Sequence, residues 1–171
     1  MIRTITMTLL ILITFILQST VFQSLSIASI APNLLLILTV SFGFMRGKKE
    51  GIFVGFFCGI LIDIFYGNLM GFYALIYMYI GYLNGFLCKV YYDEDVKVPM
   101  ILTAISDLAY GFAVYGLQFM LRGRLHVMNY VWHIMLPEMI YTVLITVIIY
   151  RPLYRLNHWL TEREWEGPKL P

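Results

Sequence analysis

Charged residues are scarce in this sequence. They make up 13% of its 171 residues, about half of the share in soluble domains, which is about 25%. None occurs between Thr4 and Met45 or between Ile64 and Cys88, and 60% of all residues are hydrophobic. A water-exposed surface cannot be built from this composition. The first uncharged stretch is long enough for two membrane-spanning helices of about 20 residues and the second for one, so we expect a polytopic, all-α membrane protein.

Residues suited to enzyme chemistry are equally few. Cys58 and Cys88 lie thirty residues apart in apolar runs, without metal-ligand spacing, so free thiols are expected. His126, His133 and His158 are scattered near the ends of apolar segments, where membrane interfaces are expected. The sequence has no Gly-Lys phosphate-binding loop, and its net charge of +2 is too small to indicate a nucleic-acid partner. We therefore expect no enzyme, no metal and no cofactor.

Polar and turn-forming residues divide the apolar sequence into segments that predict a single bundle of six transmembrane helices, followed by a short cytoplasmic tail at 151–171. The segments cover approximately residues 4–22, 33–45, 51–66, 72–88, 99–121 and 131–150. The first segment resembles a signal peptide, but cleavage before Pro32 is disfavoured and more apolar sequence follows, so we expect it to be retained. The second segment spans about 20 Å as a helix, against a bilayer core of about 30 Å. It either starts earlier or is short, tilted or partly re-entrant.

The distribution of basic residues predicts the orientation. With six spans and a cytoplasmic N-terminus, ten Lys and Arg residues lie on the inner side, and only Arg122 and Arg124 lie on the outer side. Cytoplasmic flanks of membrane proteins are enriched in Lys and Arg. Five spans would move the tail outside and remove most of this asymmetry. We therefore expect both termini in the cytoplasm.

Glycines recur every four residues along the third segment. Gly51, Gly55 and Gly59 share one helix face, because residues four apart lie on the same side of a helix. Small residues at this spacing let two helices approach closely. A second pair, Gly81 and Gly85, has the same spacing on the fourth segment and predicts tight packing there.

Asp63 occupies the next position of the glycine series and is expected at the outer end of that groove. In one interpretation it is a structural residue that accepts hydrogen bonds from the turn at 67–71 or from an Arg. In the other it belongs to a site for a ligand, an ion or a partner, as acids within transmembrane segments often do. We favour the structural interpretation and keep the other open.

Two further acids are expected within the membrane. Asp107 lies about 12 Å into the fifth segment. Glu138 follows Pro137, which either kinks the sixth helix or marks its first turn, where a Glu complements the helix dipole. Arg122 is expected on the same outer side as Asp63 and Glu138, so an Arg–carboxylate contact there is a hypothesis. Asp63 and Asp107 are expected at different depths, which argues against a pair of protease aspartates.

These features leave two classes of protein. One is a small-molecule-binding or transport subunit with a cavity lined by aromatic and acidic residues. The other is a membrane scaffold that docks partner proteins.

Four pieces of the sequence, taken in their order along the chain, resemble the MreD family of bacterial rod shape-determining membrane proteins. The pieces are "APNLLLIL", "GFMRGKKEGIFVGFFCGILIDIFYGNLMGFYAL", "GYLNGFL" and "LPEMIYTVL…YRPLYRL".

The resemblance implies a non-enzymatic scaffold of the cell-elongation machinery in the bacterial inner membrane. It implies partners in lateral peptidoglycan synthesis, namely MreC, the MreB filament, RodA and a class B penicillin-binding protein. It also implies that an acid is common in the family where this chain has Asn33. The family is similar to the substrate-binding (S) subunits of energy-coupling-factor vitamin transporters, which keeps transport as the alternative.

Overall fold

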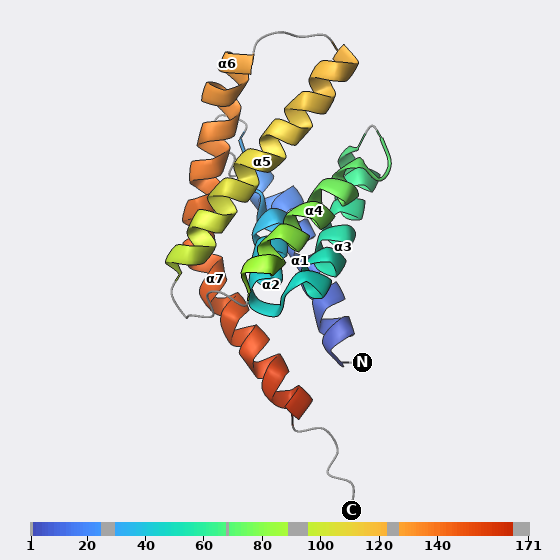
Figure 1. The fold of residues 1–171 in the computed structure, drawn as a ribbon, viewed down its shortest axis with the longest axis vertical. Helices are drawn as coiled ribbons and strands as arrows, with labels where there is room; N and C mark the ends of the chain where they lie inside the picture. Colours follow the sequence, from blue (N-terminus) through green and yellow to red (C-terminus); the bar gives the residue numbers. More distant parts are fainter. Residues whose placement is uncertain (1, 25–29, 68, 89–95, 123–126, 166–171) are drawn as a thin grey trace, which may run out of the picture.

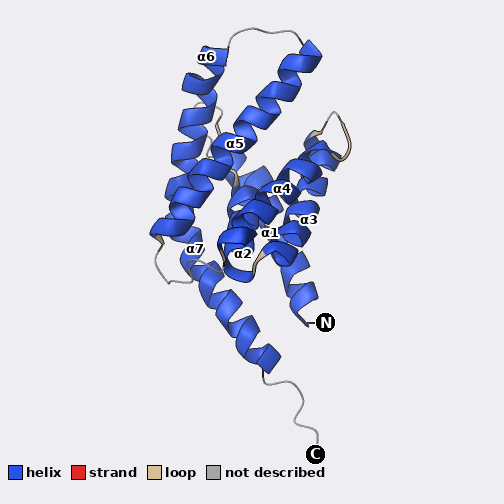
Figure 2. Cartoon of the chain, viewed as in Figure 1, coloured by secondary structure: helices blue, strands red, loops and turns tan. Residues whose placement is uncertain are grey.

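The computed structural model describes residues 2–24, 30–67, 69–88, 96–122 and 127–165. Within these residues the chain is helical and contains no strand, so the prediction of an all-α protein is confirmed (Figures 1 and 2). The elements are α1 (Ile2–Ser24), α2 (Leu34–Arg46), α3 (Lys48–Tyr66), α4 (Phe72–Leu87), α5 (Lys97–Arg122), α6 (Val127–Tyr130), the π-helical η1 (Val131–Met135) and α7 (Leu136–Trp165).

Helix α2 forms the centre of the bundle. Every residue from Leu34 to Met45 is buried, and α2 contacts α1, α3, α4, α5 and α7. A helix that is apolar on all sides is stable only where other elements surround it. The second segment is therefore a short helix that begins at Leu34, and the alternative of an earlier start is wrong. The helix has thirteen residues, is N-capped by Asn33, and is enclosed by its neighbours.

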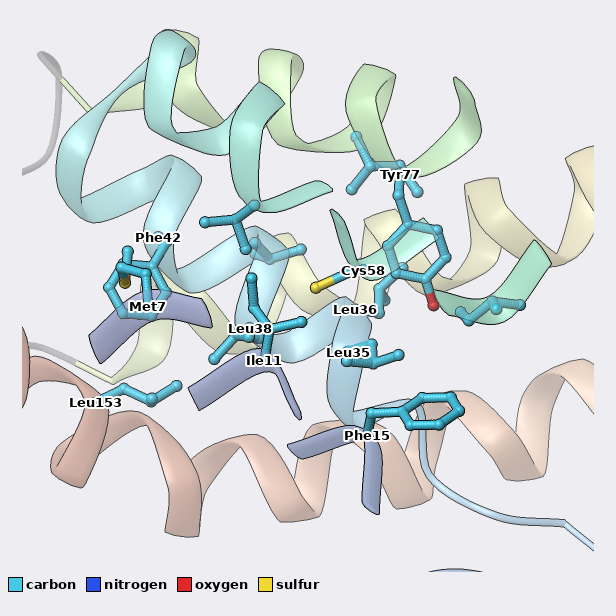
Figure 3. Close-up of a cluster of buried hydrophobic side chains, with 14 of the residues drawn as sticks. Met7, Ile11, Phe15, Leu35, Leu36, Leu38, Phe42, Cys58, Tyr77 and Leu153 are labelled. Atoms are coloured by element: carbon cyan, nitrogen blue, oxygen red, sulfur yellow. The ribbon is translucent and has the colours of Figure 1, made fainter. Parts of the chain in front are cut away.

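The hydrophobic core surrounds α2 (Figure 3). From α1, the residues Met7, Ile11 and Phe15 point into it at a spacing of four, while the other faces of α1 are exposed. Such an arrangement is typical of a helix with lipid on most of its sides, because exposed apolar residues are not penalised there. The labelled core residues from the other helices are Leu35, Leu36, Leu38, Phe42, Cys58, Tyr77 and Leu153.

Within the described residues, three helices are long and apolar enough to cross a membrane: Thr4–Phe22, Lys97–Leu117 and Val131–Glu162. The helices at Leu34–Arg46 and Phe72–Leu87 are apolar but shorter. Large hydrophobic side chains are exposed on α1, α3, α4, α5 and α7. A soluble protein does not expose apolar surface on this scale. The chain is therefore a membrane protein.

The last helical region differs from a simple span at 131–150. Residues 131–135 are π-helical, and Leu136 donates its N–H to the carbonyl of Val131. Pro137 explains this, because it has no N–H and its ring disturbs the preceding turn. The α-helix then continues through Pro152 to Trp165, so much of the expected tail is helical. Helix α5 likewise starts slightly before the expected segment and ends at Arg122.

Candidate functional site

Asn33 lies at the centre of a buried hydrogen-bond network. Its Oδ1 accepts a hydrogen bond from the Tyr77 hydroxyl at 2.7 Å and another from the Leu36 N–H at 3.2 Å. Its own N–H donates to Oγ1 of Thr142 at 3.2 Å. Asn33, Tyr77 and Thr142 are all buried. One amide residue at the start of α2 therefore joins α2 to α4 and α7.

Helix α5 adds an acid to this network. Asp107 is 5% exposed and lies within hydrogen-bonding reach of the Thr142 hydroxyl, while its Oδ1 has no hydrogen-bond partner within the described residues. Glu138 lies one helical turn before Thr142, whose hydroxyl donates to the Glu138 carbonyl at 2.8 Å. The structure thus brings Asp107 and Glu138 to the same interface between α5 and α7. The ring of Tyr110 packs edge-on against Tyr77 beside them, with centroids 5.6 Å apart.

Asp63 caps helix α4 from the neighbouring helix. Its Oδ1 accepts from the Tyr73 N–H at 3.0 Å, and its Oδ2 accepts from the Ala74 N–H at 2.9 Å. Helix N-terminal N–H groups need an acceptor, and the residue at the N-cap of α4 is Gly71, which has no side chain to supply one. Asp63 on α3 supplies the carboxylate instead, and its charge complements the positive end of the α4 dipole.

The hypothesised Asp63–Arg122 contact is not among the described interactions. Arg122 is the last residue of α5, and its side chain lies outside the described part of the chain, as does Arg124. Asp63 and Asp107 have different hydrogen-bond partners and do not contact one another in the described structure. They therefore form no shared-proton pair.

The glycines of α3 lie against the backbone of α4. A Cβ atom added at Gly51 would meet the Gly81 carbonyl oxygen, one at Gly55 would meet the carbonyl oxygen of Tyr77, and one at Gly59 would meet Cα of Ala74. Each obstacle is backbone, which cannot move aside as a flexible side chain can. The close α3–α4 approach therefore requires glycine at these three positions.

The same junction extends to α2 and to the α2–α3 turn. A Cβ at Gly43 would lie 2.8 Å from the Gly81 carbonyl oxygen, and one at Gly85 would lie 2.5 Å from Cα of Lys48. Gly47 connects α2 to α3 with a φ of 94° and a ψ of −173°, a conformation that is almost exclusive to glycine and costs other residues about 1–3 kcal/mol. Three helices are thus brought together at one cluster of small residues.

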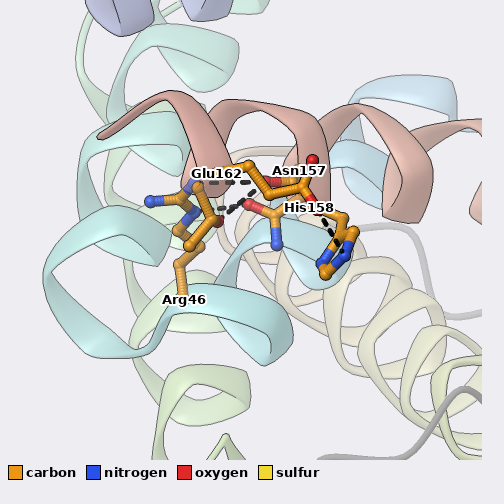
Figure 4. Close-up of polar contacts among 5 residues, drawn as sticks. Arg46, Asn157, His158 and Glu162 are labelled. Atoms are coloured by element: carbon orange, nitrogen blue, oxygen red, sulfur yellow. Dashed lines mark hydrogen bonds and ion pairs between the residues drawn. The ribbon is translucent and has the colours of Figure 1, made fainter. Parts of the chain in front are cut away.

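A second polar contact joins the other end of α2 to α7, and sequence reasoning did not anticipate it (Figure 4). Arg46 donates from Nε to Oδ1 of Asn157 and from Nη2 to Oγ1 of Thr161 at 2.9 Å. Asn157 is buried. The sequence contains one signal for it, the spacing of four between Asn157 and Thr161, in the segment expected only as a cytoplasmic tail. Asn33 also gave a signal, since an Asn before an apolar run is typical of an N-cap.

The described residues contain no group of three or more His, Cys, Asp and Glu side chains that could hold a metal ion. Cys58 is a buried free thiol and Cys88 is a partly buried one. His133 lies in η1 and His158 on α7, while His126 falls outside the described residues. Buried polar residues such as Asn33 and Asp63 form hydrogen bonds between helices.

Comparison with known proteins identifies one family. The family model for the rod shape-determining protein MreD matches residues 1–159, which is nearly the whole chain. Searches of curated proteins and of solved structures gave no significant match. The extent of the family match decides the assignment: the chain belongs to the MreD family of rod shape-determining proteins.

Proposed function

We propose that this protein is a non-enzymatic scaffold subunit of the machinery that elongates rod-shaped bacteria, acting in the inner membrane. Membership of the MreD family carries the proposal. The use of the buried polar residues agrees with it, because Asp63, Asn33 and Thr142 bind other helices of the same chain. The proposed partners are MreC, the MreB filament, RodA and a class B penicillin-binding protein, which together direct lateral peptidoglycan synthesis.

We propose six spans with both termini in the cytoplasm. The pairing of α2 with α7 supports this order. Asn33 at the start of α2 contacts Thr142, and Arg46 at its end contacts Asn157 further along α7, so the two helices run in the same direction. Second and sixth spans of a six-span chain must run in the same direction. The first turn of α1 and the last turn of α7 also lie toward the same end of the molecule (Figure 1).

The outer faces of α3 and α4 are the first place to look for partner helices. Phe53, Phe56 and Phe57 on α3 are exposed and pack against one another, with the Phe53–Phe57 centroids 4.7 Å apart. On α4, Tyr82 and Phe86 are exposed and form an edge-on pair. Aromatic residues are enriched at protein interfaces because each buries a large area with few rotatable bonds. We propose that the membrane helix of MreC docks near these residues.

The transport alternative receives no comparable support. A solute carrier needs a binding cavity within the bundle. Here α2 fills the centre, with every residue from Leu34 to Met45 buried. The substrate-binding role is therefore not favoured by the described part of the chain.

Depletion of the protein in its rod-shaped host tests the proposed function. Cells should become round and lose the lateral pattern of new wall labelling, and re-expression of the intact chain should restore both. A tagged copy should also recover MreC from detergent-solubilised membranes. Unchanged shape and labelling on depletion, with loss of the protein verified by immunoblot, would contradict the proposal.

Photo-crosslinking locates the partner surface. A crosslinker at Phe56 or Phe86 should capture MreC, whereas one at Leu144 on the exposed face of α7 should not. The three positions are all exposed apolar sites on membrane helices, so differences in yield reflect position and not accessibility. Equal capture at all three positions would contradict the proposal that MreC docks on the α3–α4 face.

A further inference from the structure

A groove on the last part of α7 combines basic and aromatic side chains. It has a volume of about 570 Å³, and Val96, just before α5, forms part of its wall. Arg151, Arg155 and His158 line it at spacings of four and three, so they share one face of α7. Trp159 borders the same groove and is 42% exposed.

On the six-span topology proposed above, the groove lies near lipid headgroups. The stretch from Val131 to Tyr150 is long enough, at about 30 Å, to cross the bilayer core. Arg151 follows directly, so a span over these residues places the groove at the edge of the hydrocarbon. With the C-terminus in the cytoplasm, this is the inner leaflet, whose surface carries anionic lipids.

The charges in the groove are arranged to receive an anion. Arg151 and Arg155 are exposed, and neither makes a hydrogen bond or an ion pair with any described residue. Glu162, which also lines the groove, has its Oε1 3.2 Å from Nε2 of His158, and no ion pair joins it to Arg151 or Arg155 among the described residues. A planar guanidinium binds phosphate oxygens in a bidentate manner. Trp159 provides the amphipathic ring that is typical of the membrane interface.

We propose that this groove binds the phosphate of an anionic phospholipid of the cytoplasmic leaflet, with Arg151 and Arg155 as its ligands and Trp159 against the glycerol region. The proposal rests on α7 crossing the bilayer with this end inside. It does not depend on the role in cell shape, so either proposal can fail without the other.

Lipid retention by the full-length protein tests the site. The protein is purified in detergent, mixed with equal amounts of phosphatidylglycerol and phosphatidylcholine, and analysed by native mass spectrometry. The wild type should retain phosphatidylglycerol preferentially. Replacement of one Arg, as in Arg155→Gln, should weaken retention about fivefold, and the double variant with Arg151→Gln should lose the preference. Arg155→Lys should retain more lipid than Arg155→Gln, because lysine keeps the positive charge. It should retain less than the wild type, because lysine lacks the planar guanidinium group.

A matched control separates a site from general surface charge. Lys49 is an exposed basic residue near the start of α3 that does not line the groove. Lys49→Gln should leave lipid retention unchanged, and equal loss in Lys49→Gln and Arg155→Gln would overturn the proposal. Inorganic phosphate in large excess should not displace the lipid. If it did, the site would belong to free phosphate and the lipid assignment would be wrong. Circular dichroism should give the same helix content for all variants, because the exchanged side chains are exposed.

Discussion

The two halves of the bundle are held together by different means. Helices α2, α3 and α4 meet through backbone contacts at glycines such as Gly51 and Gly81. Helices α5 and α7 meet through polar side chains, among them Asp107 and Thr142. Within lipid, burial of apolar surface does not drive helices together, so close packing and hydrogen bonds must supply the attraction. Close backbone packing is prominent in the first half, although Asp63 and Asn33 add hydrogen bonds there, and this difference predicts different sensitivities to substitution.

Helix α2 connects the halves. Asn33 binds Thr142 at one end, and Arg46 binds Asn157 at the other. The two residues are about 20 Å apart along α2, and their partners are about 22 Å apart along α7, at 1.5 Å per residue. The matched lengths let one short buried helix be fixed to α7 at both ends. The glycine junction then attaches α3 and α4 to the same helix.

The largest effect is expected from filling the glycine junction. In Gly51→Leu the new side chain would have to displace the Gly81 backbone, so we expect a loss of about 3 kcal/mol or more in the free energy of unfolding. Unfolding of the purified protein in mixed micelles, followed by circular dichroism, measures it. Gly116→Leu is the matched control, because a Cβ at Gly116 meets nothing within 4 Å. Equal losses for both variants would show that glycine packing does not distinguish this half.

The second effect concerns the cap on α4. Asp63→Leu removes the acceptor of two helix N–H groups, and we expect it to destabilise the protein by about 2 kcal/mol. Asp63→Asn keeps one acceptor oxygen and should lose less than half of that. Recovery of partner proteins with the tagged chain should follow the same order. If both variants retained stability and partners equally, the capping role of Asp63 would be refuted.

A smaller effect is expected where the two halves share the hydrogen-bond network. Asn33→Ala removes an N-cap and the acceptor of the Tyr77 hydroxyl, with an expected loss of about 1 kcal/mol. Asn33→Asp keeps the acceptor oxygens and should be close to wild type. A double-mutant cycle with Tyr77→Phe should give a coupling of about 0.6 kcal/mol, the average for hydrogen bonds between membrane helices. Zero coupling would mean that this bond does not connect α2 to α4.

The sequence predicts where the helices of this protein lie better than it predicts which residues contact one another between helices. Uncharged runs and turn residues are local, so the all-α fold follows from them, as does the possibility that Gly51 faces another helix. The partner of a residue is a property of the assembled bundle. Nothing local to Asp63 indicates that its acceptors serve the start of α4, or that Asp107 and Glu138 meet between α5 and α7. The continuation of α7 past Pro152 is missed for the same reason, since contacts of the later turns stabilise it.

The smallest effect tests the second attachment of α2. Arg46→Lys keeps the charge but cannot reproduce the two directed bonds to Asn157 and Thr161, so we expect a loss of about 0.5 kcal/mol in the free energy of unfolding. Lys49→Arg, an exchange of the same two residue types at an exposed site close by, should have no effect. Because Arg46 acts between α2 and α7, its loss should be additive with Gly59→Ala, which acts between α3 and α4. Strong coupling between the two would show that the halves do not behave as separate units.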